Sequence, residues 1–106
     1  MPNIKTADTN PNSPSTQWFL YMVRSGDNSL YTGITTNVER RFAEHQSKSP
    51  KAARFLKAKS NLQLVLSMEV GDHSSALRLE AAIKKLSKQQ KEYVVQDPRR
   101  LAAFRS

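Results

Sequence analysis

Apolar residues in the N-terminal half of the chain form short runs that are separated by turn residues. Residues 18–23 are rich in β-forming side chains and predict a strand. A second run, residues 30–34, follows the turn residues 25–29, so the two strands are expected to form a hairpin. Thr36 and Glu39 have the spacing of a capping box, which predicts that a helix begins at Thr36.

Apolar residues in the C-terminal half predict another strand and further helices. In residues 62–70 every second residue is apolar, which predicts a strand with one buried face. This strand is expected to end at Gly71 and Asp72. Either Ser74 or Ser75 is expected to cap the helix that follows and runs to about residue 86. The apolar stripe of that helix consists of Ala76, Leu79, Ile83 and Leu86.

A third helix is predicted after Ser87, which has the spacing of a capping box with Gln90. It carries Tyr93 and two valines and is expected to end before Pro98. The elements then follow the order ββαβαα. We therefore expect an α+β fold, in which a three-stranded, mainly antiparallel sheet is flanked by three helices.

The chain of 106 residues has the length of one domain. Residues 1–16 contain three prolines and almost no apolar residues, and they predict a disordered leader. The folded domain is expected to span residues 17–97. Residues 98–106 form a basic C-terminal tail, whose conformation the sequence leaves open.

The predicted hairpin brings polar and aromatic side chains onto one face of the sheet. In a hairpin that is symmetric about Asp27, Tyr21 lies opposite Gly33. Tyr31 lies opposite Val23 in the same register, so the two tyrosines are diagonal neighbours. Gly33 would leave room above Tyr21 for another backbone or a ligand. A register shift of one residue would instead place the tyrosines on opposite faces.

The first helix carries two ionisable residues on its apolar stripe. Val38, Arg41, Phe42 and His45 have the spacing i, i+3, i+4 and i+7, which places them on one face. Ordinary packing accounts for each of them separately: tyrosines pack in strands, an arginine snorkels and a histidine sits at a boundary. Their concentration in one hairpin and one helix fits a functional site better.

The composition favours a polyanion as the partner. Lys and Arg number 17 against 9 Asp and Glu, and the isoelectric point is near 10.1. A merely soluble basic protein or a ribosome-associated factor has a similar balance. The absence of cysteine excludes disulfides and thiolate metal sites. The sequence has no apolar run long enough to span a membrane and no signal-peptide pattern, so a cytoplasmic location is the default expectation.

Basic residues are concentrated between positions 40 and 59, where seven basic residues accompany one acidic residue. After Pro50, residues 51–59 are compatible with either a short basic helix or a loop. Phe55 fits two roles equally, as a residue that stacks on a base or as part of the core. The candidates for phosphate contacts are Arg40, Lys48, Lys51, Arg54, Lys57 and Lys59.

Glu80 lies at the edge of the apolar stripe of the second predicted helix. A carboxylate on the core side of a helix is uncommon unless it is paired or binds a cation. Both interpretations are open from the residues alone, because Lys84 has the i,i+4 spacing of a helical ion pair with Glu80.

These residues together resemble the GIY-YIG nuclease family. Leu20-Tyr21 stands in the place of the first motif and Tyr31-Thr32-Gly33 in the place of the second. The resemblance runs from about Trp18 to Gln96 and is strongest to the small stand-alone bacterial (YhbQ-like) group. The family's further motif residues match Arg24, Arg41, His45 and Glu80. Each motif alone is weak evidence, but the ordered series is specific.

Two positions depart from the family pattern. The first motif lacks its glycine, since Phe19-Leu20-Tyr21 stands where Gly-Ile-Tyr would. The chain also has no asparagine after Asn61, whereas many members carry one late in the domain. Lys88 or Lys91 is a candidate to replace it.

The resemblance implies a metal-dependent endonuclease that hydrolyses DNA phosphodiesters and acts in repair or processing of DNA structures, with RNA not excluded as a substrate. Tyr21 would be the general base, with its pKa lowered by nearby Arg24 and the metal. Glu80 would hold one Mg²⁺ or Mn²⁺. Arg41 would stabilise charge on the phosphoryl oxygens. Tyr31 and His45 would position phosphate and water, although His45 also fits a structural role.

Two other functions fit the same residues. One is a nucleic-acid-binding module of this fold with little or no cleavage, since a fold does not guarantee an activity. The other is an adaptor whose helices dock a protein partner, for which the sequence offers only the unexplained tail. Metal-dependent nicking of a plasmid distinguishes the nuclease from both.

Overall fold

The computed structural model describes residues 16–104 of the chain. The leader predicted for residues 1–16 therefore lies outside the described residues, except for Thr16. Thr16 is buried next to the first strand. Every helix within residues 16–104 is too short or too polar to cross a membrane.

The centre of the fold is a three-stranded antiparallel sheet in the order β2-β1-β3. Its strands are β1 (Trp18–Arg24), β2 (Leu30–Thr35) and β3 (Gln63–Gly71). The hairpin pairs Tyr21 with Gly33 and Val23 with Tyr31, as its symmetry predicts. Asn28 adopts a left-handed backbone conformation (φ 71°) in the turn, which an asparagine tolerates better than most residues.

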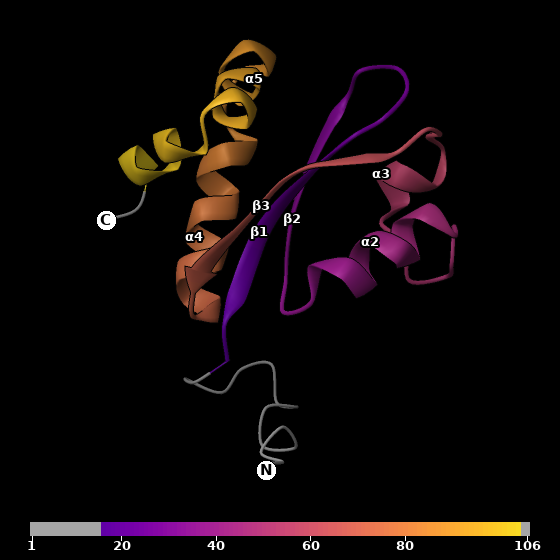
Figure 1. Ribbon diagram of the computed structural model, residues 1–106, viewed down its shortest axis with the longest axis horizontal. Helices are drawn as coiled ribbons and strands as arrows, with labels where there is room; N and C mark the ends of the chain where they lie inside the picture. Colours follow the sequence, from indigo (N-terminus) through magenta and orange to yellow (C-terminus); the bar gives the residue numbers. More distant parts are fainter. Residues whose placement is uncertain (1–15, 105–106) are drawn as a thin grey trace.

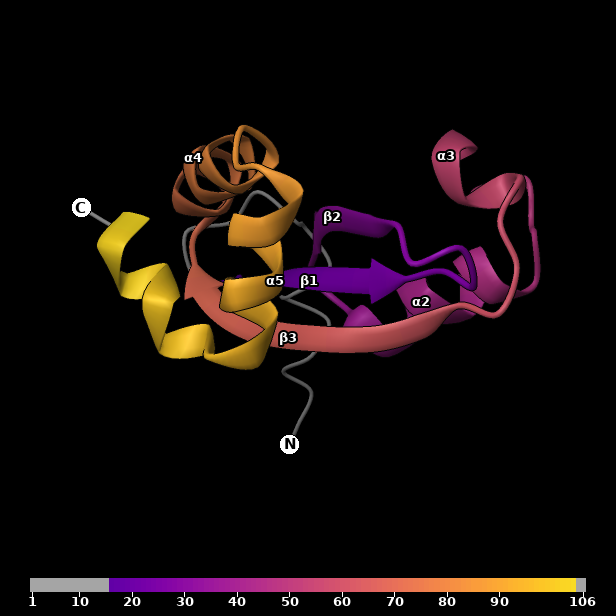
Figure 2. The ribbon, with the colours of Figure 1, turned by 90° about the horizontal axis from the view of Figure 1, so that it is seen from above.

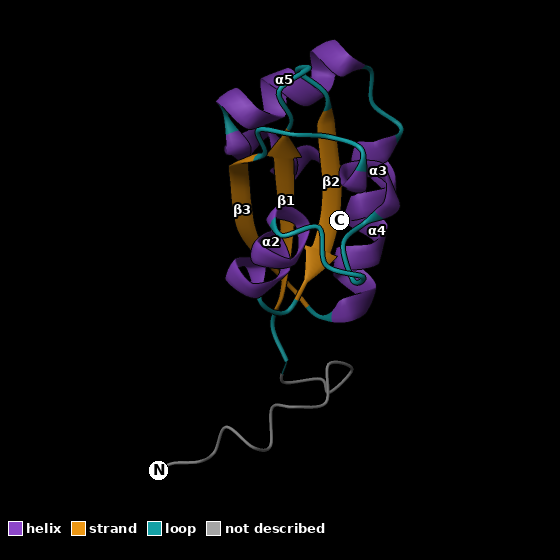
Figure 3. Ribbon diagram, turned by 90° about the vertical axis from the view of Figure 1, so that its right-hand side faces the viewer, coloured by secondary structure: helices purple, strands orange, loops and turns teal. Residues whose placement is uncertain are grey.

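Helices cover both faces of this sheet. On one side of β1 lie α2 (Val38–Gln46) and α3 (Arg54–Lys57), and on the other lie α4 (His73–Lys84) and α5 (Lys88–Gln96). Figure 2 shows the same layers from above, and Figure 3 shows α2 in front of the strands. The predicted α+β architecture is confirmed, and α3 is an additional short helix within the basic segment.

Two of the three predicted helix starts need correction, because a nearby residue supplies the better cap. The side chain of Asn37, not of Thr36, accepts the hydrogen bond of the Arg40 amide at the start of α2. At the start of α4, Asp72 caps through the amide of Ser75. Carboxylate and amide oxygens of Asp and Asn cap at least as well as serine. The capping box between Ser87 and Gln90 of α5 is confirmed.

The sheet separates two clusters of buried side chains. On the α4 and α5 side the cluster is apolar and includes Leu20, Met22 and Ile83. The segment predicted as a tail contributes to it, because η1 (Pro98–Phe104) places the fully buried Leu101 there. On the α2 and α3 side a smaller cluster contains Tyr21, Val23 and Leu56. The second cluster is the one that carries ionisable groups.

Candidate active site

The buried phenol of Tyr21 is at the centre of the α2 side of the sheet. Its side chain is only 1% exposed. A Cβ atom at Gly33 would lie 2.6 Å from Tyr21 Oη, so this position excludes any larger residue without a shift. The room that the sequence predicts above Tyr21 is therefore occupied by the Tyr21 ring itself. Gly33 serves to admit that ring into the sheet face.

His45 of α2 is hydrogen-bonded to Tyr21, with 2.8 Å between Nε2 and Oη. The backbone N–H of Ala53 donates to the other ring nitrogen, Nδ1, at 3.2 Å. Because Nδ1 accepts a hydrogen bond, the neutral ring carries its proton on Nε2. The Nε2–H of His45 therefore donates a hydrogen bond to Tyr21 Oη, and the hydroxyl proton of Tyr21 points away from His45.

Burial determines the ionisation of both groups. Burial, together with neighbouring Tyr31, raises the pKa of Tyr21 well above its usual value of 10, while Arg41 acts in the opposite direction. Burial and the positive charge of Arg41 lower the pKa of His45 to about 4. At neutral pH the free protein therefore has a neutral phenol and a neutral imidazole. The expected lowering of the Tyr21 pKa by Arg24 is therefore wrong, and the expected lowering by a bound metal stays a prediction.

Arg41 is the cation that acts on Tyr21. Its Nη1 donates to the carbonyl of Lys51 at 2.6 Å and to Glu44 Oε1 at 2.9 Å. The guanidinium is thus held in one orientation between α2 and the following loop. It retains further N–H groups with which to bind phosphate oxygens. Its side chain is 26% exposed, so a ligand can reach it.

Arg24 lies on the opposite face of the sheet, although the sequence places it among the site residues. Side chains alternate along a strand, so a residue three positions after Tyr21 projects to the other side. There Arg24 forms a bidentate ion pair with Glu92 of α5, at 2.7 Å for both contacts. The hydrogen bonds from Arg24 and Lys88 lower the pKa of Glu92 to about 2. Arg24 joins the hairpin to α5 and does not adjust the pKa of Tyr21.

Tyr31 lies between the buried phenol and the surface. Its ring centroid is 6.2 Å from that of Tyr21 and 5.6 Å from that of His45. On its outer side it stacks with Phe55 of α3 at 6.2 Å and an angle of 19°. Phe55 is therefore neither a core residue nor an isolated surface residue, and it extends the aromatic series from Tyr21 outward.

Glu80 is paired with Lys84 on the outer part of α4, with 3.2 Å between the charged atoms. The Glu80 side chain is 19% exposed, and Lys84 Nζ lies 6.0 Å from the centroid of Tyr31. This places the ion pair close to β2, at the edge of the sheet that the tyrosines approach. The i,i+4 ion pair expected from the spacing is thus present. A cation that reaches this partly exposed side chain would have to displace the ammonium group of Lys84.

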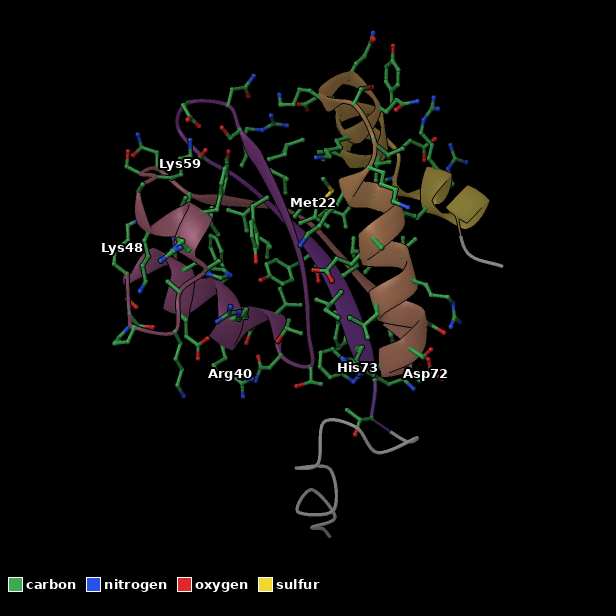
Figure 4. All side chains as sticks on the ribbon, turned by 180° about the vertical axis from the view of Figure 1, so that it is seen from behind. Met22, Arg40, Lys48, Lys59, Asp72 and His73 are labelled. Carbon is green, nitrogen blue, oxygen red and sulfur yellow. The ribbon has the colours of Figure 1, made fainter. Side chains whose placement is uncertain are left out.

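The basic residues of segment 40–59 divide into two groups. Lys48 Nζ donates to the carbonyls of Leu56 and Lys59, so it braces the loop around α3. Lys59 pairs with Asp27 of the hairpin at 2.6 Å. The other predicted phosphate contacts have exposed side chains, and Figure 4 shows Arg40, Lys48 and Lys59 along the outer border of this layer. Besides Lys48, the exposed residues among the predicted phosphate contacts are Arg40, Lys51, Arg54 and Lys57.

Comparison with known proteins identifies the fold that holds this site. Residues 17–93 match the family model of the GIY-YIG catalytic domain. The chain belongs to the GIY-YIG nuclease family. YhbQ, a UPF0213 protein of Escherichia coli K12, is 56% identical over 80 residues, which cover 76% of this chain and 78% of YhbQ. A UPF0213 protein of Klebsiella pneumoniae is 56% identical over 78 residues, or 74% and 72% of the two chains.

A solved structure supports the same assignment. The solution structure of the protein EF2693 from E. faecalis is 33% identical in sequence and has a TM-score of 0.54. The match covers 76% of this chain and 83% of EF2693. The predicted GIY-YIG resemblance and the predicted fold class are therefore both confirmed.

GIY-YIG nucleases use a divalent metal ion, and the residues present restrict how such an ion would bind. Within residues 16–104, no group of three or more His, Cys, Asp and Glu side chains is arranged to hold a metal ion. Glu80, the carboxylate that the family resemblance predicts as the metal ligand, belongs to no such cluster within these residues. A single carboxylate fits Mg²⁺ or Mn²⁺ only if waters and substrate phosphates complete the coordination shell. The residues fit a metal that binds together with its substrate.

Several groups at the site have no sequence signal of their own. The amide of Ala53 selects the His45 tautomer, yet any non-proline residue would supply it. Glu44 shares an exposed helix turn with other polar residues, which gives no hint that it orients Arg41. Of the two lysines suggested to replace the late asparagine, Lys88 pairs with Glu92 on the far side. Lys91 lines a groove beside Tyr31 and is the better candidate.

Proposed function

We propose that this protein is a metal-dependent endonuclease that hydrolyses phosphodiester bonds in DNA and acts in repair or processing of DNA structures. The observation that carries the proposal is the buried Tyr21–His45 pair beside the oriented guanidinium of Arg41. A buried phenol that accepts a hydrogen bond from a neutral imidazole is a costly arrangement for a core and a suitable one for proton transfer. Membership in the nuclease family gives the pair its context.

Different residues of the site contribute different parts of the reaction. Tyr21 accepts the proton of the attacking water, and the N–H of His45 stabilises the phenolate that this requires. Because burial opposes that ionisation, the phenolate forms only when the site holds its substrate and a cation. The positive charge of Arg41 also favours the phenolate, and its remaining N–H groups bind phosphoryl oxygens. Tyr31 positions the phosphate at the edge of the sheet.

Glu80 would hold the divalent ion, which when bound supplies positive charge next to the leaving oxygen. Lys84, its present partner, would then be free to contact a neighbouring phosphate. This proposal requires only one metal ion, because residues 16–104 contain no cluster of three or more side chains that could hold a metal ion.

The test of this function is the substitution Glu80→Gln. Glutamine keeps the shape of the side chain but loses the charge that holds a divalent ion. Plasmid nicking with Mg²⁺ or Mn²⁺ is expected to collapse, while metal-free DNA binding stays the same or becomes tighter because a negative charge is removed. The matched control is Glu69→Gln, which removes an exposed carboxylate from β3 and should leave nicking unchanged.

Two results would contradict the proposal in different ways. Equal nicking by wild type and Glu80→Gln would remove Glu80 from the metal site. Nicking by neither protein, with DNA binding intact, would favour the nucleic-acid-binding module of the same fold.

A further inference from the structure

An exposed aromatic ring stands at the outer end of the candidate site. Phe55 is 45% exposed, although it stacks on Tyr31 with one face of its ring. Tyr31 in turn contacts Tyr21 and His45. The ring of Phe55 is therefore held in place from the inside and leaves part of its surface for a ligand that lies next to the reacting groups.

A groove adjoins this ring and has a volume of about 250 Å³. That is somewhat smaller than a site for a whole drug-sized ligand, for which about 300–1,000 Å³ is usual. It suits one part of a larger molecule that continues along the surface. The groove lies along β2, with α3 on one side and α4 and α5 on the other. It is lined by Leu30, Tyr31, Thr32, Phe55, Lys84 and Lys91.

The charges around the groove are complementary to a phosphate backbone. Lys84 and Lys91 line it, and no carboxylate is among its lining residues in the described part of the chain. Lys59 Nζ lies 4.9 Å from the centroid of Phe55, on the hairpin side. Lys59 is paired with Asp27, and Lys84 is paired with Glu80. A strand that places a base against the rings would therefore place its phosphates near Lys91 or exchange one of these ion pairs for a phosphate contact.

A buried polar atom in the groove lining also lacks a partner. Thr32 Oγ1 has no hydrogen-bond partner within residues 16–104, although Thr32 is only 3% exposed. A buried hydroxyl without a partner is unusual and costs stability. Because this oxygen is itself shielded by the surrounding protein, only the rings and the charges, and not this atom, indicate a ligand in the groove.

We propose that Phe55 and Tyr31 form a stacking platform for one unpaired base, and that the substrate class of this nuclease is nucleic acid with unpaired nucleotides. The proposal rests on the proposed function, because it places the base next to Tyr21 and Arg41. In a regular duplex the bases stack on each other and face away from the protein, so a duplex can use the lysines but not the rings. A single strand or a locally unpaired segment can use both.

The experiment measures binding by fluorescence anisotropy in EDTA, with the full chain and labelled probes of about twelve nucleotides. One probe is single-stranded oligothymidylate, the second is a strand of the same charge made entirely of abasic sites, and the third is a duplex hairpin. The variants are Phe55→Leu, which removes the aromatic face, and Phe55→Trp, which keeps it. Tyr93→Leu is the matched control, since Tyr93 is 42% exposed on α5 and lines no part of the groove.

We expect Phe55→Leu to weaken binding of oligothymidylate about 5-fold to 150-fold, which corresponds to about 1–3 kcal/mol for one stacked base. Binding of the abasic strand and of the duplex should change less than about 2-fold, because neither presents a base to the ring. Phe55→Trp should restore the affinity, and Tyr93→Leu should not alter it. If Phe55→Leu folds poorly, the fluorescence of the tryptophan added in Phe55→Trp tests the same contact. Oligothymidylate should quench this fluorescence, and the abasic strand should not.

Three results would overturn the proposal. The first is an equal loss of affinity for oligothymidylate and the abasic strand in Phe55→Leu. The second is no loss for either, and the third is wild-type binding to the duplex that is as tight as binding to oligothymidylate. All three are seen without metal, so they are distinct from a failure of cleavage. Wild-type protein that binds the base as expected but never cleaves any probe with Mg²⁺ or Mn²⁺ would instead contradict the proposed nuclease function.

Discussion

The two faces of the sheet are built from alternate residues of the same strand and yet differ in chemistry. Toward α4 and α5, β1 presents Leu20 and Met22, which join an apolar cluster that extends to Leu101. Toward α2 and α3 it presents Tyr21 and Val23, and the neighbours there include ionisable groups. In Figure 4, Met22 points toward α4, away from the α2 side. One face supplies mainly stability, and the other holds polar groups in a fixed arrangement.

The difference shows how a small domain can bury reactive groups. The apolar cluster excludes water over most of the sheet and carries the hydrophobic stabilisation. The polar face then needs only to satisfy its own hydrogen bonds, and His45 does this through Tyr21 and Ala53. We therefore expect substitutions of buried apolar residues on the α4 face to alter unfolding, and substitutions of the ionisable residues around Tyr21 to alter cleavage or the dependence of stability on pH.

The largest expected effect on stability is that of Ile83→Ala on the apolar face. Ile83 is fully buried, and removing its side chain leaves a cavity. We expect a loss of about 2–5 kcal/mol in the free energy of unfolding, measured by urea denaturation. The cleavage rate per folded molecule should be unchanged. Leu77→Ala on the same helix is the control, because Leu77 is 46% exposed and should lose little stability. A specific loss of activity in folded Ile83→Ala would break the division between the faces.

A comparable effect on activity is expected from Arg41→Ala on the other face. Loss of a donor that stabilises the transition state should lower the cleavage rate about 100-fold to 1,000-fold, or about 2.7–4 kcal/mol. Arg41→Lys should restore little, because an ammonium group cannot form the same bidentate contacts. Arg78→Ala is the control, since Arg78 is exposed on α4 and is not among the predicted phosphate contacts. An insoluble or molten Arg41→Ala protein would mean that the guanidinium is chiefly a brace for the loop at Lys51.

A third prediction concerns stability as a function of pH. The pKa of His45 is about 4 in the folded protein and about 6.5 when unfolded, so the unfolded chain binds this proton first. The stabilisation from His45 is complete above pH 6.5 and is lost as the pH falls toward 4. We expect a loss of about 2 kcal/mol between about pH 7 and pH 5, measured by urea unfolding.

The other ionisable groups around His45 do not account for a loss of stability between about pH 7 and pH 5. Tyr21 and Arg41 do not change charge between about pH 5 and 7, and the hydrogen bond from Arg41 lowers the pKa of Glu44 below its usual value. The variant His45→Gln should lose this pH dependence, whereas His73→Gln on the opposite face should keep it. The same pH dependence in His45→Gln would assign it to other groups.

The smallest expected effect per residue is that of the surface charges. Charge reversal of Lys51, Arg54 and Lys57 together should flatten the dependence of DNA affinity on salt, by roughly 0.9 log units per log unit of salt for each phosphate that is no longer neutralised. The control is charge reversal of Arg78, Lys85 and Arg99, which are exposed on the other helical layer. Equal slopes for the two variants would assign the segment around α3 to solubility alone.

Much of the fold was predictable because its signals are local. The symmetric turn around Asp27 correctly predicts that Tyr21 pairs with Gly33. The capping box at Ser87 correctly predicts the start of α5. The cap of α2 lies after the predicted residue and that of α4 before it, since each segment contains several residues able to cap and only the backbone geometry selects one of them.

The site was predictable to a smaller extent. The spacing on α2 places Arg41 and His45 on the inner face, and the family motif names Tyr21 and Glu80. Arg24 shows the limit of motif matching in this chain. Its position after Tyr21 matches the family, but strand alternation directs its side chain to the other face, where Glu92 binds it.

The sequence by itself determined the three strands, the three longer helices and the register of the hairpin, because these depend on residues a few positions apart. It left open the conformation of residues 51–59 and of the C-terminal segment, which fold as α3 and η1. The tertiary structure decided the state and partners of the ionisable groups. The bond between Tyr21 and His45 joins residues 24 positions apart, and that between Arg24 and Glu92 joins residues 68 positions apart. Burial, which raises the pKa of Tyr21 and lowers that of His45, exists only when the sheet and helices exclude water together. The exposed stack of Phe55 on Tyr31 likewise exists only where α3 folds back beside β2.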